Sequence, residues 1–232
     1  MKLGFFTDPH YGSDRPHVKT RFYSQSLRKM KEAYAHFEAA NCDLVICLGD
    51  LIDQEKDHAD EIAHLREAAA VIDASSIPTV CVMGNHDAFT FTPEEFYQIL
   101  GQSRRPRNQY TDGKNLIFLD ACFYSDGTHY LTGDDRWEDT FYPDADGLEQ
   151  LLTQLQGDTY LFLHQNIDPN LPENHRLSND AQLRKLLEQS GIVRTVFQGH
   201  YHPGSHCTHN GIQYVTFAAM SDFEDTFRIV EI

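Results

Sequence analysis

The sequence of 232 residues lacks the features that mark several classes of protein. No apolar run approaches the roughly 18 residues that a membrane-spanning helix needs. Met1 and Lys2 lead directly into a strand-like run, without the hydrophobic core of a signal peptide. The five cysteines form no CxxC pair, and Cys47 and Cys81 lie inside apolar runs, which predicts buried thiols. These absences lead us to expect a cytoplasmic protein with no membrane partner.

Positive charge is also scarce, because 35 Asp and Glu face only 19 Lys and Arg, for a formal net charge of −16. Such a surface repels polyphosphate backbones and anionic membranes, which makes nucleic acid an unlikely partner. A small phosphorylated substrate stays compatible with this charge, because bound cations reverse its sign locally. With no repeat or linker and 41% hydrophobic residues, residues 1–232 are expected to form a single domain of unknown oligomeric state.

The sequence does contain short apolar runs that each end in Asp, Asn or His. Leu44 to Leu48, for example, reads as a buried strand followed by Gly49, Asp50 and Asp53. Four other runs lead in the same way into Asp8 and His10, Asn85 and His86, His164, and His200 and His202. Because open α/β sheets bind ligands beyond the carboxyl ends of their strands, we expect these residues to share one rim.

Helical periodicity between the runs predicts helices at about 21–40, 57–74, 146–156 and 179–190, and a short helix that begins at Thr92. The alternation of strand and helix predicts parallel strands with right-handed crossovers. Asp-Gly at 112–113 and Asn-Gly at 210–211 predict hairpins, and 225–231 reads as a last strand. About ten strands are too many for one ordinary open sheet. We therefore expect an α/β fold in which two sheets pack face to face with helices outside.

Residues 121–145 are predicted to form a long loop, which we expect to act as a lid or a specificity element. Aromatic rings in the loops could stack on a base, although packing of the loop against the domain is the more common role. These rings belong to Tyr11, Phe89, Phe123, Tyr124, His129, Tyr130, Trp137 and Tyr201. The candidates for substrate contact are Tyr11, Arg15, Phe123, Tyr124 and Tyr201, with Arg15 either facing a second phosphate or lying on ordinary surface.

Asp, Asn and His without a thiolate suit borderline or hard metals such as Mn, Fe or Zn. Each residue has an ordinary alternative, because Asp after a strand often caps a helix and Gly-Asp often forms a turn. Together the candidates are too many for one ion that must also hold water and substrate. They suit two ions that share a bridging carboxylate. The seven candidate ligands are Asp8, His10, Asp50, Asn85, His164, His200 and His202.

These blocks resemble, in the same order along the chain, the signature blocks of the calcineurin-like metallophosphoesterases. The blocks are Asp8-Pro9-His10, Gly49-Asp50, Gly84-Asn85-His86-Asp87, His164 and Gly199-His200-Tyr201-His202. The resemblance implies a four-layer α/β/β/α sandwich of two mixed sheets flanked by helices. It also implies that Asp8, His10 and His202 hold one metal ion, that Asn85, His164 and His200 hold the other, and that Asp50 bridges both. His86 would contact the phosphoryl oxygen or protonate the leaving group, held by Asp53.

Such a centre is expected to activate a bridging water between ions roughly 3.5–4 Å apart, and the hydroxide then attacks phosphorus. Gln54 after Asp53, and Asp87 rather than Glu after His86, depart from the protein-phosphatase branch of the family. The chain looks closer to compact members that hydrolyse cyclic nucleotides, ADP-ribose-type diphosphates or other small diesters. We therefore expect a metal-dependent phosphoesterase acting on a small soluble phosphodiester or pyrophosphate. The alternatives are a phosphomonoesterase or, less favoured, a non-catalytic metal-binding scaffold.

Overall fold

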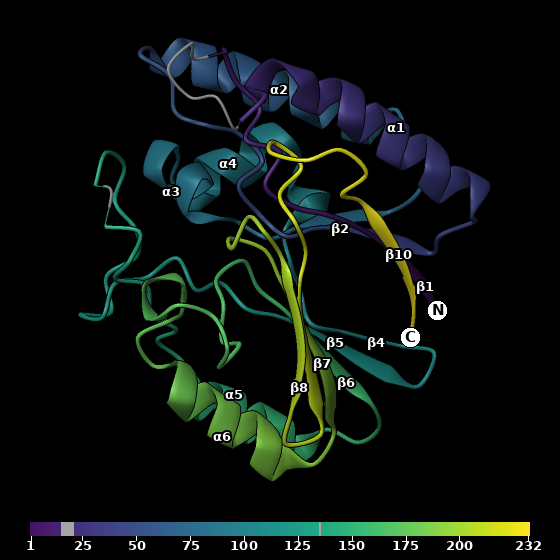
Figure 1. The fold of residues 1–232 in the computed structure, drawn as a ribbon, viewed down its shortest axis with the longest axis vertical. Helices are drawn as coiled ribbons and strands as arrows, with labels where there is room; N and C mark the ends of the chain where they lie inside the picture. Colours follow the sequence, from purple (N-terminus) through teal and green to yellow (C-terminus); the bar gives the residue numbers. More distant parts are fainter. Residues whose placement is uncertain (15–20, 135) are drawn as a thin grey trace.

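Two β-sheets lie at the centre of the structure (Figure 1). The structure is a computed structural model and describes residues 1–14, 21–134 and 136–232. The first sheet has the order β10-β1-β2-β3 and the second the order β4-β5-β6-β7-β9-β8. The first comprises β1 (Lys2–Phe6), β2 (Leu44–Cys47), β3 (Thr79–Cys81) and β10 (Arg228–Glu231). The second comprises β4 (Gln109–Thr111), β5 (Lys114–Phe118), β6 (Thr159–Phe162), β7 (Val193–Gln198), β8 (Ser205–His209) and β9 (Ile212–Thr216).

Helices cover the outer faces of the two sheets (Figure 1). On the side of the four-stranded sheet lie α1 (Ser26–Ala39), α2 (His58–Asp73), α3 (Asn85–Thr90) and α4 (Pro93–Leu100). On the side of the six-stranded sheet lie α5 (Ala145–Gln154) and α6 (Asp180–Ser190). Short 3-10 turns add η1 (Tyr23–Gln25), η2 (Gln102–Arg104) and η3 (Glu173–His175). The predicted four-layer α/β/β/α sandwich is confirmed.

Aromatic residues fill the space between the two sheets. The ring centroid of Phe5 on β1 lies 4.7 Å from that of Phe197 on β7, and Phe118 and Phe162 stack at 4.8 Å. Successive residues of a strand point to opposite faces, so Phe5 enters this inter-sheet core while its neighbour Phe6 joins the core beneath the helices. Both faces of β1 are therefore buried, which explains its continuous apolar sequence.

Most local predictions agree with the structure. Thr92 caps α4 with its side chain, followed by Pro93 at the first position, and both glycine-containing hairpins form. The last strand is shorter than 225–231, because Asp225 has a φ of 54° that a strand does not accommodate. The helix predicted at 21–40 begins only at Ser26, after η1. The helix α3 directly after β3 was not predicted.

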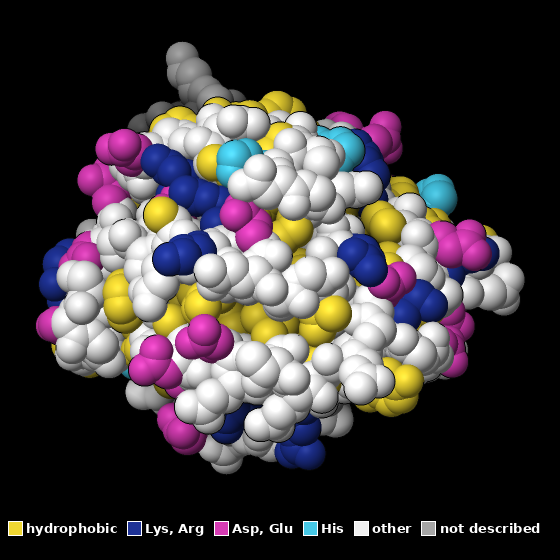
Figure 2. Space-filling model, turned by 90° about the horizontal axis from the view of Figure 1, so that it is seen from below, with side chains coloured by type: hydrophobic (Ala, Val, Ile, Leu, Met, Phe, Trp, Pro, Cys, Tyr) yellow, Lys and Arg dark blue, Asp and Glu magenta, His cyan; other side chains and the backbone are white. Residues whose placement is uncertain are grey.

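Four further observations concern the character of the chain. The described residues between 119 and 144 contain no helix or named strand, only isolated bridges such as Cys122 with Phe141. Cys47 and Cys81 are free and buried, as expected. None of the helices in the described ranges has the length and apolar content that crossing a bilayer demands. On the face that carries α5 and α6, Lys and Arg side chains are interspersed with Asp and Glu around a central strip of hydrophobic side chains (Figure 2).

Candidate metal centre

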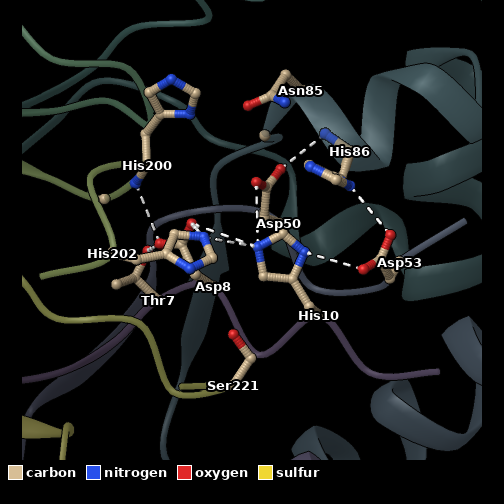
Figure 3. A network of polar contacts seen from close by, with 12 residues as sticks. Thr7, Asp8, His10, Asp50, Asp53, Asn85, His86, His200, His202 and Ser221 are labelled. Carbon is tan, nitrogen blue, oxygen red and sulfur yellow. Dashed lines mark hydrogen bonds and ion pairs between the residues drawn. The ribbon is translucent and has the colours of Figure 1, made fainter. Parts of the chain in front are cut away.

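The seven candidate ligands all follow the carboxyl ends of parallel strands. Asp8 and His10 follow β1, Asp50 follows β2, and Asn85 opens α3 after β3. His164 follows β6, while His200 and His202 follow β7. The strands β1, β2 and β3 run parallel in one sheet, as do β6 and β7 in the other. Both sheets therefore deliver their polar residues to the same rim, where the structure brings all seven together. Figure 3 labels all of them except His164.

The backbone at this rim adopts an uncommon conformation. Four of the candidate ligands have a positive φ: Asp8 at 50°, His10 at 44°, Asp50 at 51° and His200 at 65°. Residues other than glycine are uncommon in this region, and such residues cluster at functional sites where surrounding structure maintains the strain. The backbone geometry thus points to a functional site independently of the side chains.

Two glycines allow the strand ends to approach one another. A Cβ on Gly84 would lie 2.2 Å from Asp50 Oδ1, and a Cβ on Gly49 would lie 2.6 Å from His164 Nδ1. Gly49 also has a φ of 102°, which side chains rarely adopt. Only glycine therefore lets Asp50, Asn85 and His164 come together.

Asp8, His10 and His202 form what we call the first half-site (Figure 3). His10 Nε2 lies 3.1 Å from His202 Nε2 and 3.7 Å from Asp8 Oδ1. His202 Nε2 lies 3.6 Å from the same oxygen of Asp8. Three donor atoms from two different sheets thus face one small volume.

Asn85, His164 and His200 form the second half-site. His164 Nε2 lies 3.1 Å from Asn85 Oδ1, and the donor atoms of His164, His200 and Asp50 lie within 4.8 Å of one another. Asp50 Oδ2 is 3.2 Å from His164 Nε2 and 3.5 Å from His10 Nε2. One carboxylate oxygen therefore faces both half-sites, which is the position that a bridging ligand needs.

Some polar atoms in this cluster have no hydrogen-bond partner in the described part of the protein and are placed to coordinate a metal ion instead. Within the described residues, Asp8 Oδ1 and His200 Nε2 are buried and have no hydrogen-bond partner. A buried polar atom without a partner is costly unless something else completes it. The nitrogen and oxygen donors lack thiolate and match Mn, Fe or Zn. The side chains that are present thus fit a two-metal centre.

The pKa shifts within the cluster run in both directions. Burial raises the pKa of Asp50, but the charges of His164 and His86 outweigh it and hold this pKa well below its usual range. Burial lowers the pKa of His164, but the Asp50 carboxylate overcomes this and raises it to about 9. Burial, together with the charge of His86, lowers the pKa of His10 to about 4. The Asp50 carboxylate, which raises the pKa of His164, would also stabilise a metal cation beside it.

His86 lies beside the candidate ligands and contacts a buried carboxylate. Its Nδ1 lies 3.1 Å from Asp53 Oδ1, and Asp53 is fully buried. Burial lowers the pKa of His86, yet the Asp50 charge and the Asp53 hydrogen bond outweigh it, so the net shift of this pKa is upward. His86, His10 and Asp50 also have donor atoms within 4.8 Å, so proximity alone does not separate His86 from a ligand. His202 likewise has a carboxylate partner and lines the cavity, so the separation of His86 from the ligands stays the prediction made from the sequence.

Two residues that support the cluster were not predicted from the sequence. Asp222 Oδ2 lies 3.0 Å from His202 Nδ1. Arg21 places its guanidinium 3.7 Å from Asp53 Oδ2 and 4.0 Å from Asp222 Oδ1. Asp222 follows an apolar run at 214–220, so the rule that found the other acids could have found it. Arg21 carries no comparable local signal.

A cavity of about 420 Å³ opens beside the cluster. It is lined by Arg21, Asp50, Asn85, His86, Trp137, His175, His200, Tyr201, His202 and Pro203. This volume falls in the range of small-molecule sites, roughly 300–1,000 Å³. The candidate ligands therefore border a space that a small substrate can enter.

The predicted substrate contacts are placed unequally around this cavity. Tyr201 lines it, whereas the Tyr11 hydroxyl donates to Glu67 and Tyr124 is buried with its hydroxyl donating to the carbonyl of Asp134. Phe123 packs its ring against His129, 4.8 Å away, and is not among the lining residues. Tyr11, Phe123 and Tyr124, which we expected to contact the substrate, thus do not line this cavity. Their side chains contact other residues instead. Arg15 lies outside the described residues.

Comparisons with known proteins agree with this geometry. Residues 1–204 match the family model described as calcineurin-like phosphoesterase. A probable cyclic nucleotide phosphodiesterase of Psychrobacter arcticus is 24% identical over 202 residues, covering 80% of this chain and 67% of the relative.

Solved structures show the same fold. A dimetal phosphatase from Danio rerio superposes with a TM-score of 0.84 at 17% identity, over 98% of this chain and 91% of that one. A phosphopantetheinyl hydrolase from Mycobacterium tuberculosis superposes with a TM-score of 0.59 at 12% identity, over 99% and 95% of the two chains. Because the family model covers most of the chain, including every block singled out in the sequence, the protein belongs to the calcineurin-like phosphoesterase family of dinuclear metal-dependent hydrolases.

Proposed function

We propose that this protein hydrolyses a small soluble phosphodiester or pyrophosphate with two metal ions, one in each half-site. The observation that carries the proposal is the position of Asp50 Oδ2, which faces His10 at 3.5 Å and His164 at 3.2 Å. A single oxygen shared by two sets of donors is what a dinuclear centre requires. Asp8, His10 and His202 would hold one ion, and Asn85, His164 and His200 the other.

The ions, when bound, supply Lewis acidity that lowers the pKa of water and neutralises phosphoryl charge. The chain itself provides the proton for the leaving group. Asp53 is buried and contacts Nδ1 of His86, which keeps the imidazole oriented and favours its charged form. His86 lines the cavity, so its other ring nitrogen can donate a proton to the departing oxygen.

The diester preference rests on the Psychrobacter relative, which is described as a probable cyclic nucleotide phosphodiesterase. A phosphomonoesterase is the second candidate, because the Danio rerio structure is described as a dimetal phosphatase. The donor set suits Mn, Fe or Zn, and availability selects among them. The net charge of −16 favours a small substrate over nucleic acid.

The testing experiment compares hydrolysis of bis(p-nitrophenyl) phosphate and p-nitrophenyl phosphate in the presence of Mn²⁺. Wild type is assayed beside Asp50→Asn, with bound metal measured by elemental analysis. We expect turnover of the diester by wild type and a loss of about 10³-fold or more in Asp50→Asn, because the shared ligand loses its charge.

Each outcome identifies a different function. Faster hydrolysis of the monoester would favour the phosphomonoesterase. No turnover of either ester by metal-loaded wild type would contradict an esterase and favour a non-catalytic scaffold. Full activity in Asp50→Asn would show that this carboxylate does not bridge the ions.

A further inference from the structure

Trp137 is the only tryptophan of the chain, and it lines the cavity beside the candidate metal centre. It lies in the long segment between β5 and α5. Its ring centroid is 5.2 Å from that of His175 and 5.7 Å from that of His200. The ring thus reaches the second half-site from a segment that supplies none of the candidate ligands.

Two more rings stand beside Trp137 on the cavity wall. His175 in η3 lies 5.0 Å from Tyr201 and 5.5 Å from His200, measured between ring centroids. Trp137, His175 and Tyr201 come from three separate segments, yet all three line the cavity and are only partly buried. We call these three residues the aromatic wall. Partly exposed rings that converge from separate segments offer a stacking surface next to the reacting centre.

The charge of Arg21 favours ligands that carry an anionic group beside the aromatic wall. Arg21 lines the same cavity, and its contacts to Asp53 and Asp222, at 3.7 and 4.0 Å, are longer than hydrogen bonds. Its guanidinium can therefore donate to an anionic oxygen without breaking a hydrogen bond to either carboxylate. The same guanidinium repels a cationic group such as a quaternary ammonium. A flat, uncharged ring attached to a phosphate fits both features of the cavity.

We propose that Trp137 is a specificity-determining residue that stacks on the nucleobase of a nucleotidyl diester. The inference rests on the proposed function, because it assumes that the phosphoryl group is held at the two half-sites. The cavity of about 420 Å³ has the size of a small-molecule site, within the usual range of roughly 300–1,000 Å³. The segment expected to act as a specificity element thus contributes through this one side chain.

The kinetic test uses two diesters that release the same p-nitrophenolate. One is p-nitrophenyl thymidine 5′-phosphate and the other is methyl p-nitrophenyl phosphate, which carries no base. Wild type, Trp137→Ala, Trp137→Phe and Leu131→Ala are compared by kcat/KM with Mn²⁺ present. Leu131 lies in the same segment, is 53% exposed and does not line the cavity, so Leu131→Ala is the matched control.

We expect Trp137→Ala to lower the preference for the thymidine ester by about 10-fold or more, since stacking on an aromatic side chain is strong and tolerant of sequence. Trp137→Phe should keep most of the preference, and Leu131→Ala all of it. An equal loss on both esters would overturn the inference, because it would show that Trp137 only packs the segment. If wild type hydrolyses neither ester, the proposed function fails before the inference is reached.

A binding measurement on wild type avoids dependence on a variant that folds poorly. The single tryptophan makes intrinsic fluorescence specific for this position. Thymidine 5′-monophosphate should quench the emission of metal-loaded protein, while methyl phosphate at equal occupancy should leave it unchanged. Equal changes with both ligands, or quenching by phosphocholine but not by the nucleotide, would overturn base recognition by Trp137.

Discussion

The two half-sites have similar candidate ligands but differ in which groups contact the Nδ1 atoms of their histidines. In the first half-site, Asp222 lies at hydrogen-bond distance from His202 Nδ1, 3.0 Å away, whereas Asp53 lies 3.7 Å from His10 Nδ1, which is too far for a hydrogen bond. In the second, His164 Nδ1 lies 2.7 Å from the backbone carbonyl of Leu48. An imidazole supported by a carboxylate is a more basic ligand than one supported by a carbonyl. Mutation of a supporting side chain can therefore change the metal affinity of the first half-site. In the second, the group that contacts His164 is a backbone carbonyl, which mutation does not remove.

The half-sites also differ in how many candidate ligands each sheet supplies. The first takes Asp8 and His10 from the four-stranded sheet and His202 from the six-stranded sheet. The second takes Asn85 from the four-stranded sheet and both of its histidines from the other. Each half-site thus joins the two sheets, so a bound ion would link halves of the molecule that otherwise meet through the apolar core.

Replacement of His86 by Asn should separate chemistry from metal binding at both half-sites. We expect kcat to fall by about 10²- to 10⁴-fold, the usual worth of a general acid, while both ions stay bound. Steady-state kinetics on bis(p-nitrophenyl) phosphate and elemental analysis measure the two effects. Loss of an ion in this variant would make His86 a ligand, and the division into two half-sites would then be wrong.

Removal of the metals should weaken the connection between the sheets. A ligand present at 100 times its dissociation constant stabilises the folded state by about 2.7 kcal/mol. For a chain of this size, that corresponds to a rise in Tm of roughly 5–10 °C. Thermal unfolding with Mn²⁺ and after chelation measures the difference.

The control for that measurement is Asp50→Asn, which should show a much smaller difference because the shared ligand is impaired. Identical Tm values for wild type with and without metal would contradict a centre that joins the sheets.

Replacement of Asp222 by Asn should weaken only the first half-site. Loss of a carboxylate behind a ligating imidazole typically costs about 10- to 100-fold in metal affinity. Metal titration should therefore show one weakened and one unchanged ion. Asp225→Asn is the matched control, because Asp225 is a nearby exposed acid whose side chain makes no contact with the centre among the described residues. Equal weakening of both ions would remove the distinction between the half-sites.

Much of the fold could be predicted because its signals are local. The strand-like runs, the cap at Thr92 and the glycine turns each depend on residues within a few positions of one another. The helix α3 was missed because it has only six residues and begins at a candidate ligand, Asn85. Its N-terminus depends on Asp87, whose carboxylate accepts from the backbone N–H groups of Gly84, Leu51 and Ile52. Two of those partners are distant in sequence, so the pattern at 84–90 alone did not indicate a helix.

The substrate side of the site could be predicted less well than the ligands. Tyr124 and Trp137 lie in the same loop and both looked like candidates for stacking. The fold turns Tyr124 inward, where its ring lies 3.7 Å from the guanidinium of Arg136, and leaves Trp137 on the cavity wall. No periodicity distinguishes two aromatic residues in an irregular segment, because their directions depend on how that segment packs.

By itself the sequence determined which strands end in Asp, Asn or His, and therefore that these residues would share one rim. Strand ends of parallel sheets meet at one edge whatever the loops between them do. Only the tertiary structure decided which carboxylate stands behind which histidine and which ring reaches the cavity. Those contacts join residues such as Arg21 and Asp222, which lie 201 positions apart. Their distances follow from the packing of the two sheets and their loops, which no local pattern encodes.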